Sequence, residues 1–311
     1  MTLSLAPIRG ITDYTYRSIF PKIFTGFDNA LAPFIAASNQ INIEKKLLKD
    51  FEPTKVQSIK TIPQILSKEN EDFLTLANAL FDYGYETTNW NLGCPHPLVT
   101  SKKKGSALLA YPHLIEQFLE KTIPHLKGNL SIKLRLGYQY EDEIFSIIPI
   151  LNKYPISEII IHPRTGVQQY KGEVHLDTFE KCLPLTKIPI TYNGDINTYN
   201  DFVTLKEKFP TVQKWMIGRG ALRNPLLPEE IKSGKTFSKD EKLIKLRMLH
   251  DNVFDAYKDI LCAKHLLDKM KGQWEYWANM FSDEHKTFKK IKKTRSPKEY
   301  IERVNEIFLM E

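Results

Sequence analysis

Cysteine is scarce in this chain of 311 residues, which contains Cys94, Cys182 and Cys262 and no other cysteine. The three are odd in number, lie far apart and form no CxxC pair. This spacing argues against a disulfide framework and against a zinc or iron–sulfur site. We therefore expect no bound metal, and we expect free thiols in a reducing cytoplasm.

Long apolar runs are also missing. No stretch approaches the roughly 20 apolar residues that a membrane-spanning helix needs, so we expect no membrane partner. The chain enters a strand-like segment at residues 3–7 without the pattern of a signal peptide. No internal repeat or low-complexity tract stands out. No pattern indicates an oligomer, and we expect a monomer.

Negative charge is in the minority. There are 44 Lys and Arg residues against 37 Asp and Glu residues, which gives a formal net charge of +7 at pH 7. Such an excess permits a polyanionic partner, but many basic proteins bind no nucleic acid. The charge by itself leaves both possibilities open.

Strand-like and helix-like segments alternate over roughly the first 230 residues. The strand-like segments are residues 3–7, 29–33, 62–66, 87–92, 130–136, 158–162, 188–193 and 214–217. Helical patterns between most of them cover residues 13–20, 69–83, 112–125, 141–152 and 200–208. Eight strands alternating with helices predict a parallel α/β fold, a (β/α)₈ barrel formed by residues 1–232.

The pattern changes after Pro228. Residues 232–235 are typical of a linker, and from Ser238 onward apolar residues recur only at helical spacing. We predict a small all-helical domain over residues 236–311. Its basic cluster comprises Lys286, Lys289, Lys290, Lys292, Lys293 and Arg295. Such a cluster is typical of a solvated helix face or of a surface that contacts a phosphate backbone. His250, His265 and His285 are expected on helix surfaces.

Polar or otherwise unusual residues gather where the predicted strands end, which is where the active site of a (β/α)₈ barrel lies. In strand order they are Pro7, Ile8, Arg9 and Gly10, then Gln64, then Asn91 and Cys94, then Lys133 and Arg135, then His162 and Arg164, then Asn193, Gly194 and Asp195, and finally Gly218, Arg219 and Gly220. Each has an ordinary structural explanation alone, but their coincidence predicts a site. The last two groups follow strands seven and eight, where barrels often bind phosphate, and they predict a phosphorylated ligand.

Cys94 is held between Gly93 and Pro95 at the end of its predicted strand. A free cysteine is most often a small buried residue. A thiol at the mouth of a barrel strand is also well placed for chemistry on a ligand. Lys102, Lys103 and Lys104 follow closely and form a second basic patch.

The chain resembles the tRNA-dihydrouridine synthase family. The resemblance is carried by Asn91-Leu92-Gly93-Cys94-Pro95 followed by Gly105-Ser106-Ala107-Leu108-Leu109. Further motifs occur in the family's order: Ala6-Pro7-Ile8-Arg9-Gly10-Ile11-Thr12-Asp13, Lys133-Leu134-Arg135, His162-Pro163-Arg164-Thr165 with Tyr170-Lys171-Gly172, Asn193-Gly194-Asp195 and Met216-Ile217-Gly218-Arg219-Gly220-Ala221. Ile8 and Arg9 depart from the family pattern, which usually has methionine and then a small or acidic residue.

The resemblance implies an FMN-containing barrel, a small helical domain and NADPH-dependent reduction of selected uridines in tRNA. The implied flavin contacts are Pro7, Ile8, Arg9, Gln64, Lys133 and His162, with Asn193, Gly194, Asp195, Gly218 and Arg219 at the ribityl phosphate end. Cys94 is the implied proton donor, and Asn91 and Arg135 would orient the uracil, with Arg164 beside them. The implied tRNA contacts are Lys102, Lys103, Lys104, Lys289, Lys290, Lys292, Lys293 and Arg295.

The chemistry of uracil explains why such a site needs an acid. Hydride from flavin N5 to C6 leaves an enolate with charge at C5 and O4, and C5 must then be protonated. A thiol with a pKa of about 8.5 is mostly protonated at neutral pH and can donate that proton. Lys133 near the flavin would stabilise its anionic reduced form.

Two alternatives stay open. One is another FMN-dependent barrel oxidoreductase acting on a small pyrimidine or an enone, which has no need of basic C-terminal helices. The other is a non-catalytic RNA-binding module, which has no need to keep both Cys94 and Lys133.

Overall fold

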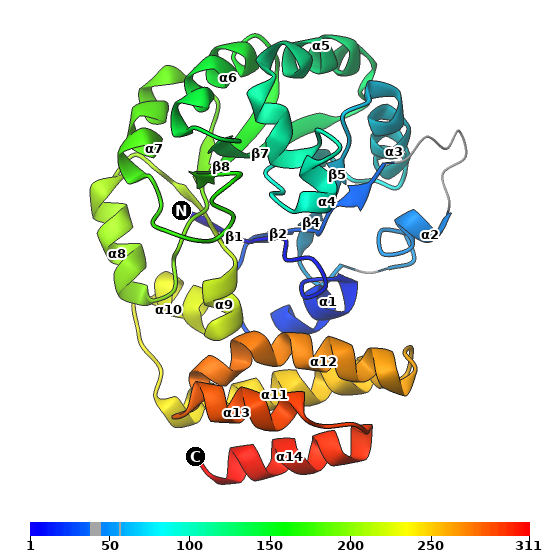
Figure 1. Cartoon of the computed structure of the whole chain (residues 1–311), viewed down its shortest axis with the longest axis vertical. Coiled ribbons are helices and arrows are strands. Elements are labelled where there is room, and N and C mark those ends of the chain that lie inside the picture. Colours follow the sequence, from blue (N-terminus) through cyan, green and yellow to red (C-terminus); the bar gives the residue numbers. More distant parts are fainter. Residues whose placement is uncertain (38–44, 56) are drawn as a thin grey trace.

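A computed structural model describes residues 1–37, 45–55 and 57–311 of the chain (Figure 1). Its strands are β1 (Thr2–Leu5), β2 (Asn29–Leu31), β3 (Ile35–Ala36), β4 (Lys60–Ile62), β5 (Gln64–Leu66), β6 (Thr87–Leu92), β7 (Asn129–Gly137), β8 (Ile156–Thr165), β9 (Ile190–Tyr192) and β10 (Lys214–Ile217). They form one parallel sheet in the order β3-β5-β6-β7-β8-β9-β10-β1-β2-β4.

The ten strands occupy eight positions of a closed ring, because two of these positions are each divided into two pieces. β4 and β5 are consecutive pieces of one segment, separated by Pro63, which has no N–H to donate. β4 pairs with β2 and β5 pairs with β6, so this segment joins the two ends of the sheet. β2 and β3 divide a second segment in the same way. The predicted (β/α)₈ barrel is confirmed, and the predicted strand 62–66 is corrected to two pieces.

Helices surround the barrel in Figure 1. They are α1 (Tyr14–Ile23), α2 (Lys45–Leu48), α3 (Asn70–Asp82), α4 (Pro97–Thr100), α5 (Pro112–Thr122), α6 (Ile144–Leu151), α7 (Leu176–Cys182), α8 (Tyr199–Lys208), α9 (Arg219–Arg223) and α10 (Leu227–Ser233), with 3₁₀ turns η1 (Gly105–Ala110), η2 (Ile123–His125), η3 (Glu141–Glu143) and η4 (Leu183–Leu185). The predicted linker 232–235 is corrected, because α10 continues to Ser233 and ends at Gly234 with a left-handed φ of 70°.

The C-terminal region is helical, as predicted. It comprises α11 (Lys239–Lys258), α12 (Ala263–Trp277), η5 (Ala278–Met280), α13 (Glu284–Lys292) and α14 (Pro297–Leu309). These helices lie together beneath the barrel in Figure 1. Within the described residues, no helix combines the length and apolar character that crossing a membrane requires.

Apolar packing connects the barrel to the C-terminal helices. One buried cluster includes Trp90 and fills the barrel and its covering helices. A second cluster joins Tyr16 and Phe20 of α1 to Trp274 and the other C-terminal helices. Removing the helices would therefore expose α1. The division into residues 1–232 and 236–311 stays a prediction.

Asp13 fixes the C-terminal helices to α1 by polar contacts. It caps α1 by accepting a hydrogen bond from the N–H of Tyr16 at 3.2 Å. Its carboxylate also accepts from Tyr257 Oη on α11 at 2.7 Å and pairs with Lys269 Nζ on α12. One side chain thus links α1, α11 and α12.

His250 is buried, which corrects the expectation that it lies on a helix surface. It lies between Leu246 and Val253 on the apolar stripe of α11, and α14 covers it. Its Nδ1 lies 2.8 Å from Asp251 Oδ1, and its Nε2 lies 2.7 Å from Tyr300 Oη. The carboxylate requires a proton on Nδ1, so Nε2 accepts from the tyrosine hydroxyl and the ring is neutral. This pairing is satisfied only while His250 is uncharged.

Acid should therefore destabilise the C-terminal helices through His250. Burial lowers the pKa of His250 below its ordinary value. Below about pH 6.5 the unfolded chain then binds a proton that the folded chain does not, and the free energy of unfolding falls by at most about 1.4 kcal/mol per pH unit. Urea unfolding at several pH values should show a smaller decrease for His250→Gln than for the unsubstituted protein. His285→Gln, at an exposed position, is the matched control, and equal slopes in all three proteins would contradict the prediction.

Candidate active site

Two adjoining cavities open at the carboxyl end of the barrel, the larger of about 550 Å³ and the smaller of about 80 Å³. Both are lined by Pro7, Ile8, Lys133, His162, Tyr170 and Arg219, so they are two parts of one cleft. Predicted residues that line only the larger part are Arg9, Gln64, Asn91, Cys94 and Arg135. Predicted residues that line only the smaller part are Asn193, Gly194, Asp195 and Gly218. The structure thus brings Cys94 and all the predicted cofactor-binding residues to one place.

A chain of side-chain amides fixes the backbone that carries Cys94. Asn91 Oδ1 accepts a hydrogen bond from the N–H of Cys94 at 2.9 Å, and Asn91 Nδ2 donates to Gln64 Oε1 at 2.8 Å. Gln64 Nε2 donates to Asn89 Oδ1 at 2.8 Å, and Asn89 Nδ2 donates to Ser131 Oγ at 2.9 Å. All these contacts except the one to Cys94 are buried, so losing one partner leaves others unsatisfied. Three neighbouring strands, β5, β6 and β7, together set the start of the loop.

The carbonyl of Cys94 is fixed from the other side by η1. It accepts hydrogen bonds from the N–H of Ser106 at 3.0 Å and from Ser106 Oγ at 3.1 Å. Gly105 has a left-handed φ of 62°, and a Cβ there would lie 2.6 Å from the carbonyl oxygen of Cys94. The close approach explains the glycine at position 105, and the two hydrogen bonds explain the serine that follows it.

The Cys94 thiol lies in a half-buried position that favours its neutral form. Burial raises the pKa of Cys94 above its ordinary value. The backbone N–H of His96 and the nearby charges of Arg9, Arg135 and Lys133 offset only part of this effect. A thiol that stays protonated at neutral pH can act as a proton donor.

Burial also disfavours charge on the basic residues of the cleft. Together with the charge of Arg135, it lowers the pKa of Lys133 to about 7. Burial, followed by the surrounding cations, holds the pKa of His162 well below its ordinary value. His162 Nε2 lies 3.2 Å from Nη1 of Arg164, which can only donate, so Nε2 accepts and the proton lies on Nδ1. An anionic ligand would favour the charged form of Lys133.

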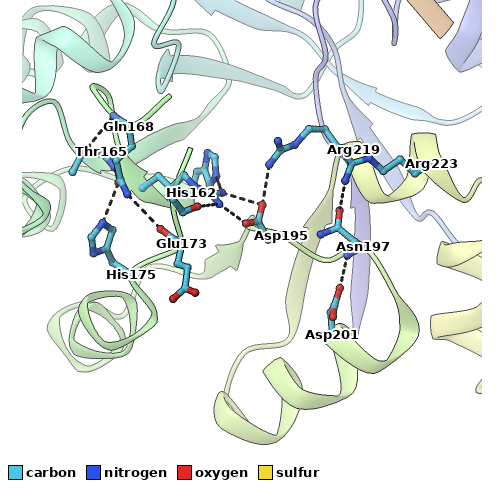
Figure 2. A network of polar contacts seen from close by, with 12 residues as sticks. His162, Thr165, Gln168, Glu173, His175, Asp195, Asn197, Asp201, Arg219 and Arg223 are labelled. Carbon is cyan, nitrogen blue, oxygen red and sulfur yellow. Dashed lines mark hydrogen bonds and ion pairs between the residues drawn. The ribbon is translucent and has the colours of Figure 1, made fainter. Parts of the chain in front are cut away.

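Asp195 pairs with two arginines at the smaller part of the cleft, where the sequence predicts a phosphate group (Figure 2). Its carboxylate pairs with both Nη atoms of Arg164, and its Oδ1 accepts from Arg219 Nη2 at 2.9 Å. Burial favours the neutral acid, but Arg164 and then Arg219 outweigh it and lower the pKa of Asp195. Arg164 also donates to the carbonyl oxygen of Gly172 at 2.7 Å and lines neither cavity. Its contacts are thus with Asp195 and the loop after β8, and its predicted place beside the substrate stays a prediction.

Several residues of the larger cavity were not assigned by sequence reasoning. They are Phe34, Gln169, Tyr170, Arg223, Glu275 and Tyr276. The ring centroid of Tyr170 lies 4.8 Å from the guanidinium carbon of Arg219 and 5.2 Å from that of Arg135. The motif that contains Tyr170 could have identified it. Glu275 and Tyr276 lie on α12, and no pattern in the sequence shows which part of that helix faces the barrel.

The predicted basic patches lie outside the cleft. Lys103 Nζ lies 4.9 Å from the ring centroid of Tyr111, and Lys104 Nζ donates to the carbonyl oxygen of Ala37 at 3.3 Å. Lys102 is exposed. On the C-terminal helices, Lys289, Lys292, Lys293 and Arg295 are exposed, and Lys290 contacts Met310 Sδ at 3.3 Å. The structure does not bring these residues to the cavity, and their contact with tRNA stays a prediction.

A parallel barrel with a thiol and several basic groups at its mouth has the architecture of a barrel enzyme, and the positive charge of its cleft favours an anionic ligand. The family profile described as dihydrouridine synthase matches residues 4–308. The chain belongs to this family and is an enzyme of the flavin-dependent oxidoreductase class, as predicted.

Individual relatives agree with this assignment. The tRNA-dihydrouridine synthase B of Pasteurella multocida is 30% identical over 227 residues, which cover 72% of this chain and 66% of that protein, just under two thirds of its length. The tRNA-dihydrouridine(16) synthase of Haemophilus influenzae is 24% identical over 322 residues, covering 98% of this chain and 100% of that one. A solved structure of an NCR variant from Zymomonas mobilis, with 12% identity and a TM-score of 0.53, covers 76% of this chain and 87% of its own, and shows the likeness of fold.

The thiol of Cys94 should titrate above the ordinary range. Alkylation by iodoacetamide requires the thiolate, so its rate at Cys94 should reach half its maximum at a pH above that of an ordinary cysteine. Arg9→Met should move this midpoint further upward, because it removes a positive charge that favours the thiolate. Mass spectrometry of alkylated peptides measures both rates, with exposed Cys262 as the internal control. A midpoint for Cys94 at or below that of Cys262 would show that burial does not control the thiol.

Proposed function

We propose that this protein is a tRNA-dihydrouridine synthase that reduces the C5=C6 bond of specific uridines in tRNA with FMN and NADPH. The observation that supports this most strongly is the position of Cys94. Its side chain lines the same cavity as Lys133, His162 and Arg219, so a thiol and a basic cofactor site face one space. That space is about 550 Å³, within the range of small-molecule sites.

The residues of the smaller cavity fit the phosphate end of FMN. Two glycines line this part where the protein's own atoms leave little room for a side chain. A Cβ on Gly194 would lie 2.9 Å from Tyr192 Oη, and one on Gly218 would lie 3.3 Å from Ala6 Cβ. Arg219 contributes a guanidinium beside them. Among the described residues, Asp195 is the one carboxylate that lines this part, and two arginines already pair with it. Lys133 lines both cavities, where it would contact the isoalloxazine ring of the flavin. When bound and reduced, the flavin supplies the hydride that adds to C6 of uracil.

The chain's own residues would supply the proton and hold the uracil ring. Cys94 keeps its proton at neutral pH and would deliver it to C5 as charge develops on the ring. Arg135 is placed beside this position, since its Nε donates to the carbonyl oxygen of Gly93 at 3.0 Å and its Nη1 to that of Thr165 at 2.7 Å. A buried guanidinium held by two carbonyl groups is a rigid donor toward a uracil oxygen.

The substrate base must leave its stack to enter this cleft, so the protein must hold the surrounding RNA. We propose that the C-terminal helices serve this purpose, as a tRNA-binding domain of residues 236–311. The residues that we propose contact phosphates are Lys102, Lys103, Lys104, Lys289, Lys290, Lys292, Lys293 and Arg295. The free thiol is consistent with the reducing cytoplasm where tRNA is modified. Mapping dihydrouridine in tRNA from a strain that lacks this protein would identify the reduced position.

Replacing the thiol should separate flavin chemistry from product formation. Cys94→Ala should retain bound FMN and its reduction by NADPH, because no flavin contact is removed, and should lose most dihydrouridine formation. A general acid typically contributes about 10²–10⁴-fold. Flavin absorbance and dihydrouridine content measure the two steps, with Cys262→Ala as the matched control. Undiminished product from Cys94→Ala would exclude the proton-donor role, and a protein that binds no flavin would favour a non-catalytic RNA-binding module.

Removing positive charge from α13 should weaken tRNA binding without altering the cleft. The exposed lysines Lys289, Lys292 and Lys293 form no ion pair with another described residue. Their combined replacement by Gln should lower affinity for tRNA and reduce the steepness of its salt dependence. Filter binding at several salt concentrations measures both, and Lys206→Gln on the barrel helix α8 serves as a control. An unchanged salt dependence would assign these lysines to a solvated surface.

A further inference from the structure

A third cavity, of about 240 Å³, lies on the flank of the barrel between α3 and α5. Three lysines from separate segments line it: Lys68 after β5, Lys103 before η1 and Lys121 on α5. The carboxylate among its lining residues is Glu69, and Lys68 Nζ lies 3.8 Å from it. Neither Lys103 nor Lys121 pairs with an acid in the part of the chain that the structure describes. Positive charge therefore exceeds negative charge in this cavity.

Lys103 occupies a backbone position that ordinarily favours glycine. Its φ is 53°, in the left-handed region. The N–H of Lys103 donates to the carbonyl oxygen of Thr100 at 2.9 Å, and that of Lys104 donates to Val99 at 3.3 Å. These two hydrogen bonds form the helix C-terminal motif in which the left-handed residue is usually glycine. A lysine here costs backbone free energy, which points to a role for its side chain. The ammonium group of Lys103 lies over the ring of Tyr111, 4.9 Å from its centroid, and Lys103 also lines the cavity.

We propose that this cavity binds one backbone phosphate of the RNA substrate, an inference that rests on the proposed function. Three lysines and one glutamate line the cavity, and this excess of positive charge favours a backbone phosphate, which carries one negative charge. The volume has room for about eight water molecules, more than a phosphate group with five heavy atoms fills. Leu108 of η1 and Phe118 of α5 form its apolar side, and the side-chain amides of Asn70 and Gln117 can donate further hydrogen bonds to phosphate oxygens.

The cavity is also connected to the thiol. Lys103 belongs to the segment that begins at Cys94 and returns to it, because Gly105 and Ser106 contact the carbonyl oxygen of Cys94. A phosphate held by Lys103 would therefore anchor the RNA to the same loop that presents the proton donor. This arrangement would fix the strand next to the extruded base relative to the thiol.

The test measures binding of bulk tRNA that lacks dihydrouridine, over a range of salt concentrations, to the flavin-loaded protein. The combined variant Lys68→Ala, Lys103→Gly and Lys121→Ala should bind several-fold more weakly. Its plot of log affinity against log salt should be shallower by about 0.7–0.9, the amount for one neutralised phosphate. The KM for tRNA should rise by a larger factor than kcat falls. Lys187→Ala, an exposed lysine before β9 at the opposite end of the barrel, is the matched control and should match the unsubstituted protein.

The single variant Lys103→Gly separates a functional from a structural role. Glycine relieves the left-handed backbone, so the thermal midpoint should stay the same or rise while tRNA affinity falls. Equal affinity and equal salt dependence in the combined variant and the unsubstituted protein would overturn the inference. A raised KM for NADPH with an unchanged salt dependence for tRNA would assign the cavity to a dinucleotide phosphate and also overturn it. If the unsubstituted protein forms no dihydrouridine, the proposed function fails, and the binding curves still decide whether the cavity holds RNA.

Discussion

The position of the Cys94 backbone is the constraint on which the site depends. Asn91 holds its N–H and the Gly105–Ser106 turn holds its carbonyl, so both peptide groups of the residue are fixed by hydrogen bonds from different segments. A proton donor must reach one carbon atom of a ring that is itself held elsewhere, and a displacement of about 1 Å can cost about 10²-fold in rate. The buried amides of Gln64 and Asn89 extend this restraint into the barrel, where rigid parallel strands carry it.

Burial of positive charge is the second constraint. Lys133, Arg135, His162 and Arg164 lie in or beside one cleft, and Asp195 is the carboxylate that two arginines of this end share. Desolvation lowers the pKa of Lys133 to about 7 and that of Arg135 to about 10. The same burial raises the pKa of the thiol. A single physical cause thus prepares both an acid that stays protonated and a cationic site that gains from an anionic ligand.

Much of this arrangement is predictable because barrel strands have a simple pattern. Alternating segments indicated all eight strand positions, and the residues at the ends of seven of the strands indicated the cleft, because parallel strands bring their carboxyl ends together. The break at Pro63 and the short helix α10 were missed, since both depend on local hydrogen bonding that the apolar pattern does not encode. His250 was misplaced because a polar residue can be buried when a tyrosine and a carboxylate satisfy both ring nitrogens, and the tyrosine, Tyr300, is distant from it in sequence. The contribution of Tyr276 depends on how α12 docks, which no local pattern encodes.

The docking of α12 shows that the cleft is built by two parts of the chain that must fold together. Asp13 begins α1, directly after the strand that supplies Pro7 and Ile8, and its carboxylate contacts Tyr257 on α11 and Lys269 on α12. Because α12 is held at Lys269, its later residues Glu275 and Tyr276 reach the mouth of the barrel. The shared apolar cluster around α1 makes this contact part of the protein's core. Glu275 and Tyr276 are therefore carried to the cavity that Cys94 lines by a helix packed into the core, and under the proposed function an RNA held by the C-terminal helices would be positioned relative to the thiol by packed structure.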